Sequence, residues 1–133
     1  MEQGPCAGTI LVVDDEPLVS QLIADILNRF GYGVLTADCG ADAVNLYQKQ
    51  HQEIDAVVLD VVMPVMDGKE TLRRLRAINP QVVVIISSGH SHDNDADDLL
   101  KQGAVAFVQK PYRIADLMQA VKDAVERKKR GNE

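Results

Sequence analysis

The segment Asp55-Ala-Val-Val-Leu-Asp60-Val-Val-Met-Pro64-Val-Met-Asp67-Gly68 joins an apolar run to a carboxylate and a loop. The run from Ala56 to Leu59 has the length and composition of a buried strand in a parallel sheet. An ionised carboxylate at the end of such a strand is costly without a partner, and open α/β sheets leave a crevice for ligands and cations at that edge. Asp60 is therefore the first candidate functional residue, although an aspartate that ends a strand is more often a helix cap or turn residue.

On either side of this segment, strand patterns alternate with helix patterns. Apolar runs predict strands at 9–13, 34–37, 55–60, 82–86 and 105–108. Helical spacing predicts helices at 17–30, from 40 onward, at 68–78, at 95–102 and from 114 onward. The apolar stripe of the first helix comprises Leu18, Val19, Leu22, Ile23, Ile26, Leu27 and Phe30. The stripe of the last helix comprises Ile114, Leu117, Met118, Val121 and Val125. This alternation predicts an α/β fold with a doubly wound parallel five-stranded sheet.

Composition narrows the classes of function. The chain has 133 residues, 46% of them hydrophobic, which is enough for one domain with a substantial core. Its net charge of −6 argues against direct nucleic-acid binding, and the basic run 126–130 fits a helix C-terminus. The two cysteines, Cys6 and Cys39, have no metal-site spacing and favour a reducing, cytoplasmic setting. No apolar run is long enough to span a membrane, so we expect no membrane contact.

Chemically active side chains stand at the carboxyl ends of four predicted strands. They are Asp14, Asp15, Asp60, Ser88 and Lys110. Three carboxylates placed together repel one another, and a hard divalent cation such as Mg²⁺, or Mn²⁺ in its place, relieves that repulsion. With a hydroxyl and an ammonium added, the set suits phosphoryl transfer, in which an aspartate can act as nucleophile and form an acyl phosphate.

These motifs resemble the receiver domain of two-component response regulators. The run Asp14-Asp15-Glu16-Pro17 is similar to the acidic opening of that family, and Leu59-Asp60 to Gly68 is similar to its phosphoacceptor strand and loop. Ser88-Gly89 and Lys110-Pro111 match two further motifs in the right order. The resemblance covers 9–128 and implies a three-layer, flavodoxin-like domain with strand order 2-1-3-4-5, a flexible lead-in at 1–8 and a flexible tail at 129–133.

The resemblance also implies a role for each acid. Asp60 would be the phosphoacceptor and, with Asp15, a direct ligand of Mg²⁺. Asp14 would bind the cation through water, and the backbone carbonyl of Val62 would supply a further ligand. An aspartyl-phosphate hydrolase would need a second acid where Val62 stands, so a phosphatase is a weaker alternative. The chain also lacks the glycine-rich loop of GTPases.

The resemblance also implies which residues bind the phosphoryl group and which change conformation after phosphorylation. Ser88, Gly89 and Lys110 would bind the phosphoryl group, and Ser88 would act with Phe107 as the switch. Ser87 competes for the role of Ser88, but the spacing from Asp60 and to Lys110 favours Ser88. The Lys110–Pro111 bond would be cis.

Two residues are predicted to set the phosphoryl lifetime. Val62 and His90 would flank the path of an attacking water, with His90 as a plain surface residue being the alternative. Tyr112 is expected to pack over the start of the last helix.

The expected partner is a sensor histidine kinase or a histidine phosphotransfer domain. The helix at 95–102, the strand at 105–108 and the helix from 114 would form the output face, through which a homodimer could also form. The chain would not be an enzyme in the ordinary sense, because it would catalyse only its own phosphorylation and slow dephosphorylation. A phosphate sink and the receiver part of a hybrid histidine kinase remain as alternatives.

Overall fold

The computed structural model describes residues 8–60, 68–88, 94–110 and 112–131. The strands are β1 (Gly8–Val13), β2 (Tyr32–Ala37), β3 (Ala56–Asp60), β4 (Val84–Ser88) and β5 (Ala106–Gln109). The helices are α1 (Pro17–Arg29), α2 (Gly40–Gln50), α3 (Gly68–Ile78), α4 (Asn94–Lys101) and α5 (Ile114–Gly131). The predicted alternation of strands and helices is confirmed.

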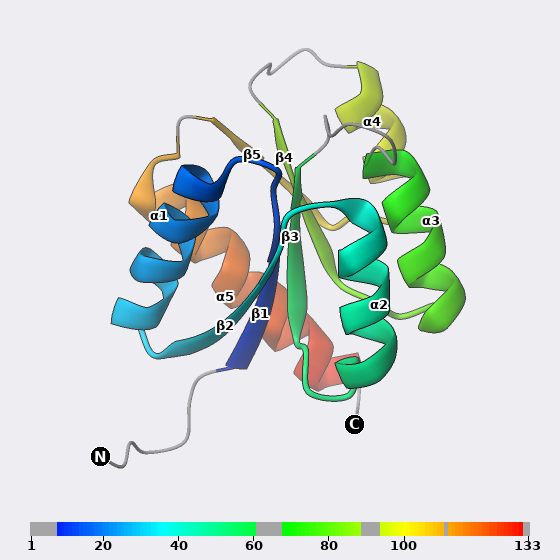
Figure 1. Ribbon diagram of the computed structural model, residues 1–133, viewed down its shortest axis with the longest axis horizontal. Coiled ribbons are helices and arrows are strands. Elements are labelled where there is room, and N and C mark those ends of the chain that lie inside the picture. The colour runs from blue at the N-terminus through cyan, green and yellow to red at the C-terminus, as the bar shows by residue number, and fades with distance from the viewer. Residues whose placement is uncertain (1–7, 61–67, 89–93, 111, 132–133) are drawn as a thin grey trace.

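All five strands are parallel and lie in the order β2-β1-β3-β4-β5, as predicted. The chain leaves β1 in one direction to form β2 and then returns to build β3, β4 and β5 on the other side (Figure 1). The strand order therefore reverses between β1 and β3, which is where doubly wound sheets bind ligands beyond the carboxyl ends of their strands. The residues that end β1 and β3 flank this point.

Helices cover both faces of the sheet, with α1 and α5 on one face and α2, α3 and α4 on the other (Figure 1). Successive side chains of a strand point to opposite faces. Thus Leu11 and Leu59 lie in the core cluster under α2 and α3, and Ile10 and Val58 lie in the cluster under α1 and α5. Burial on both faces explains why the strands are almost continuously apolar.

The apolar stripe of α1 is wider than the surface that the sheet covers. Ile23 and Leu27 are fully buried, as predicted, but Leu18 is 86% exposed and Leu22 is 52% exposed. Phe30, at the other end of the helix, is also exposed. The apolar stripe is thus only partly core, because residues 18 and 22 lie one turn apart on a flank of the helix that no element in the described part of the chain covers.

Strand β4 begins and ends two residues later than predicted. Val82 donates its backbone N–H to the Asn79 carbonyl in the preceding turn (3.0 Å), and pairing with β3 starts near Val83, whose carbonyl accepts from Val57 (2.9 Å). Ser87 and Ser88 consequently belong to the strand and not to the loop that follows. At the chain ends, regular structure reaches from Gly8 to Gly131.

None of the helices in the described ranges is both long and apolar enough to cross a membrane.

Candidate functional site

Asp14 is placed at the sheet edge by one backbone and one side-chain hydrogen bond. Its N–H donates to the Ala37 carbonyl (3.1 Å), which continues the pairing of β1 with β2 by one residue. Its Oδ1 accepts a hydrogen bond from the Glu16 N–H (2.9 Å), which turns the chain into α1. Pro17 starts that helix at a position where a missing N–H costs nothing. The result is a carboxylate that is only 1% exposed.

Asp60 is the last residue of β3 and is 5% exposed. Carboxylate oxygens of Asp14, Asp15 and Asp60 lie within 4.8 Å of one another, and of the three acids only Asp15 is exposed to solvent. The structure thus brings together the three acids that the sequence places at adjacent strand ends. The reason is topological, because β1 and β3 are neighbours and both end at this edge.

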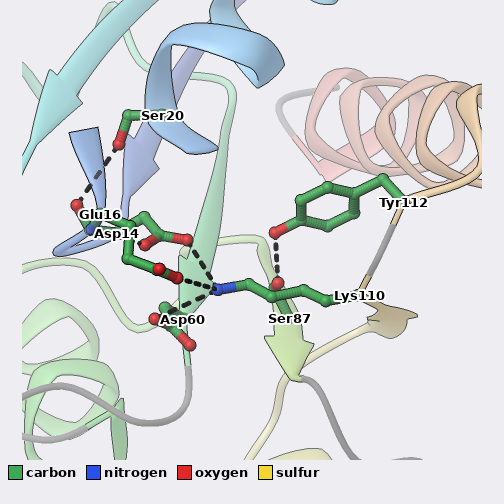
Figure 2. Close-up of polar contacts among 7 residues, drawn as sticks. All are labelled: Asp14, Glu16, Ser20, Asp60, Ser87, Lys110 and Tyr112. Carbon is green, nitrogen blue, oxygen red and sulfur yellow. Dashed lines mark hydrogen bonds and ion pairs between the residues drawn. The ribbon is translucent and has the colours of Figure 1, made fainter. Parts of the chain in front are cut away.

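Lys110 directly follows β5 and points into the acidic cluster (Figure 2). Its Nζ lies 2.9 Å from Asp14 Oδ2, 3.4 Å from Asp60 Oδ2 and 3.8 Å from Glu16 Oε1. Its backbone N–H donates to the Ser88 carbonyl (2.8 Å), which ties the lysine to the end of β4. One ammonium therefore contacts carboxylates from the ends of two other strands.

The electrostatics of this cluster keep the lysine charged. Burial on its own lowers the pKa of Lys110, but the contact with Asp14 and the negative charges of Asp60 and Asp14 outweigh burial and raise the pKa above its ordinary value. The Asp14 contact is an ion pair, since no donor in the described part of the chain is aligned for a hydrogen bond to the buried Oδ2 atom. A buried carboxylate oxygen in that condition, beside two further acids, suits a divalent cation and its water ligands.

The two serines at the end of β4 face opposite sides of the sheet. Ser88 alternates with Val84 and Ile86 and so faces the core cluster under α2, α3 and α4, against which Phe107 also packs. Both predicted switch residues therefore lie on one face of adjacent strands.

Ser87 lies on the other face, and its hydroxyl shares a hydrogen bond with the Tyr112 hydroxyl (Figure 2). Sequence reasoning assigned Tyr112 a packing role only, and its hydroxyl partner was missed. A tyrosine two residues beyond the lysine, together with two adjacent serines at the strand end, was the available signal.

Several predicted site residues lie outside the described residues. These are Val62, Gly89, His90 and Pro111. Accordingly, the metal-binding carbonyl, the phosphate contact at Gly89, the control of lifetime and the cis bond stay predictions.

A flavodoxin-like sheet with three carboxylates and a lysine at its switch point defines a class of α/β domains built for phosphoryl chemistry at that edge. The family model described as "Response regulator receiver domain" matches residues 10–122 of this chain. The chain belongs to this family and is a phospho-accepting receiver domain of two-component signalling.

Individual relatives agree with this assignment. The chain is 36% identical over 121 residues to the sensor kinase CckA of Brucella abortus. The matched region is 91% of this chain but only 13% of the kinase. It is 34% identical over 116 residues to the chemotaxis protein CheY of Bacillus subtilis, covering 86% of this chain and 95% of that protein. Among solved structures, the CheX–CheY–BeF₃–Mg²⁺ complex from Borrelia burgdorferi matches with a TM-score of 0.83 and 31% identity, covering 87% of each chain.

Proposed function

We propose that Asp60 is the phosphoacceptor and that it receives its phosphoryl group from a phosphohistidine. The observation that carries this proposal is the position of the Asp60 carboxylate, which is almost fully buried, 3.4 Å from the Lys110 ammonium and clustered with Asp14 and Asp15. In the reaction, a carboxylate oxygen of Asp60 bonds to phosphorus while the phosphorus–nitrogen bond of the donor breaks. The bonding electron pair returns to the imidazole nitrogen of the donor.

The acidic cluster would hold Mg²⁺, or Mn²⁺ in its place. Asp15 and Asp60 would be direct ligands, Asp14 would bind through water and the Val62 carbonyl would complete the protein's share. The carboxylates of Asp14, Asp15 and Asp60 lie close enough together to bind one cation. Asp14 Oδ2 is buried and has no aligned hydrogen-bond donor among the described residues, which also fits metal binding. The Borrelia complex contains Mg²⁺ with BeF₃. When bound, the cation would neutralise charge that develops on the phosphoryl oxygens.

Lys110 and Ser88 would serve the transferred group. The ammonium, which contacts Asp14 and Asp60, would pair with a phosphoryl oxygen of the transferred group. The Ser88 hydroxyl would donate to another phosphoryl oxygen, with the Gly89 backbone beside it. Movement of Ser88 toward the phosphoryl group would change the packing of Phe107, since both lie on the same face of adjacent strands.

The donor would be a sensor histidine kinase or a histidine phosphotransfer domain in the cytoplasm. Support comes from an apolar hollow of about 320 Å³ beside the acidic cluster, lined by Val19, Leu22, Lys110 and Tyr112. Leu18 and Leu22 of α1 and Ile114 of α5 are large apolar side chains that are exposed to solvent. A helical donor with an apolar flank can bury these side chains and bring its phosphohistidine to Asp60.

Phosphorylation would then alter the face formed by α4, β5 and α5, for a downstream partner or a homodimer. Asp98 of α4 is paired with Lys69 of α3 (3.1 Å), whereas Arg113 and Lys122 are exposed near and on α5. A receiver that accepts phosphoryl groups without this change would serve as a phosphate sink.

The test is phosphorylation by acetyl phosphate with Mg²⁺, followed by intact-mass measurement. We expect one base-labile phosphoryl group in the wild type and none in Asp60→Asn. Asp55→Asn, at the opposite end of β3, should be labelled like the wild type. Label that persists in Asp60→Asn, or that lies on a serine or histidine, would contradict the assignment. Beryllofluoride added with Mg²⁺ should shift amide signals across 88–122, and a shift confined to the pocket would favour the sink.

A further inference from the structure

Two hydrogen bonds tie the segment that carries Lys110 to successive residues of β4. The Lys110 N–H donates to the Ser88 carbonyl (2.8 Å). Two residues later, the Tyr112 hydroxyl reaches back to the Ser87 hydroxyl (Figure 2). We propose that Tyr112 is a positioning residue for phosphotransfer, because its hydrogen bond with Ser87 holds the Lys110 segment against β4 and thereby sets the place of the ammonium. This inference rests on the proposed function, in which Lys110 stabilises the transferred phosphoryl group.

The position of Ser87 explains why this tether matters for the site. Ser87 is paired in register with Asp60 on the neighbouring strand. A tie from Tyr112 to Ser87 therefore fixes the lysine segment relative to the strand that carries the phosphoacceptor. The Lys110 ammonium is 3.4 Å from Asp60, so a small displacement of its backbone moves it out of contact.

The burial of Ser87 makes the hydrogen bond between the two hydroxyls costly to lose. Ser87 is 1% exposed, and no second hydrogen bond to its hydroxyl occurs within the described part of the chain. A buried hydroxyl without a partner is unfavourable, so loss of the Tyr112 hydroxyl leaves an unsatisfied group next to the site. Burial raises the pKa of Tyr112 above its ordinary value of 10.0.

The ring and the hydroxyl of Tyr112 have separable roles. The ring packs against the core cluster under α1 and α5 and lines the hollow beside Lys110. Tyr112→Phe keeps the ring and removes only the hydroxyl. Tyr47→Phe is the control, because Tyr47 is a tyrosine on α2, under the other face of the sheet, whose hydroxyl also has a side-chain hydrogen-bond partner, Asn79 (3.1 Å).

The experiment measures the rate of Asp60 phosphorylation by acetyl phosphate at saturating Mg²⁺, over a range of donor concentrations. Tyr112→Phe and Ser87→Ala should each lower the maximal rate about three- to tenfold with little change in the half-saturating donor concentration. The double variant should be no slower than the slower single variant, and Tyr47→Phe should match the wild type. In a Lys110→Ala background, Tyr112→Phe should have no further effect.

A second readout does not depend on phosphorylation. Hydrogen exchange of the Lys110 amide should accelerate in Tyr112→Phe and not in Tyr47→Phe, since only the former releases the segment from β4. An unchanged maximal rate in Tyr112→Phe, or equal slowing in the Lys110→Ala background, overturns the positioning role. A wild type that acquires no phosphoryl group overturns the proposed function instead, and the exchange measurement then still decides whether the tether exists.

Discussion

At the scale of single residues, the site depends on the contact between the Lys110 ammonium and two buried carboxylates. Asp14 and Asp60 are almost entirely removed from water, and Lys110 is the cation whose Nζ lies within 3.5 Å of both. A buried charge that loses its partner is costly, whereas a surface pair contributes little. Lys110, which we propose stabilises the transferred phosphoryl group, should therefore also be needed for stability when no divalent cation is bound.

Lys110→Ala should lower the free energy of unfolding by about 3 kcal/mol in metal-free buffer at pH 7, because two buried carboxylates lose their counter-ion. Mg²⁺ should restore part of that loss and stabilise the variant more than the wild type. Urea denaturation with and without Mg²⁺ measures both effects. The control is Lys69→Ala, which breaks the half-exposed pair with Asp98 and should cost at most about 1 kcal/mol. Equal losses in the two variants would contradict the role of Lys110.

At the scale of elements, α3 is stabilised by charge pairs on its solvent side. Glu70 in the first turn accepts hydrogen bonds from Arg73 (3.0 Å) and Arg74 (2.7 Å), the residues three and four positions later. These hydrogen bonds lower the pKa of Glu70 to about 2 from an ordinary value of 4.5. An acid near a helix N-terminus is also favoured by the helix dipole.

The lowered pKa gives a stability contribution with a defined pH window. Because the folded-state pKa lies below the unfolded value, the contribution is present above pH 4.5 and is lost as the pH falls toward 2. Urea midpoints measured between these values should therefore fall less steeply for Glu70→Gln than for the wild type. High salt should narrow the difference, since the pair is exposed. Identical slopes for both proteins at low salt would show that the pairs contribute nothing.

At the scale of the whole molecule, the acidic cluster and the exposed apolar side chains lie close together. The Leu22 side chain lines the hollow that Lys110 also lines, and Leu18 lies one turn away on the same helix. In the proposed docking mode a protein donor covers this region of α1, whereas a small phosphodonor does not depend on it. The two kinds of donor should therefore respond differently to changes on α1.

Leu22→Glu should slow phosphotransfer from a phosphorylated histidine kinase or phosphotransfer domain by about tenfold or more, because it places a charge in an apolar contact. Phosphorylation by acetyl phosphate should be unchanged. Phe30→Glu is the matched control, since Phe30 is similarly exposed (55%) at the far end of the same helix. Equal slowing with both donors would place the defect in the pocket, and no slowing with either would remove α1 from the docking surface.

The sequence alone determined the architecture and most of the candidate site. Apolar runs alternating with helical stripes predicted a parallel doubly wound sheet, and the order β2-β1-β3-β4-β5 confirms it. Asp14, Asp15, Asp60 and Lys110 could be grouped without coordinates because parallel strands in βαβ units deliver their carboxyl ends to one edge. Residue spacing along the chain is enough for that inference.

Only the tertiary structure decided which side each residue faces and what it contacts. Pairing with β3 sets the start of β4, and the strand lies two residues later than the sequence predicted. Both serines therefore belong to the strand, and the Ser87 hydroxyl forms a hydrogen bond with the Tyr112 hydroxyl. The exposure of Leu18 and Leu22 likewise depends on how far neighbouring elements extend over α1. Strand register and burial arise from contacts between residues distant in the chain, and a local pattern of apolar and polar residues does not contain them.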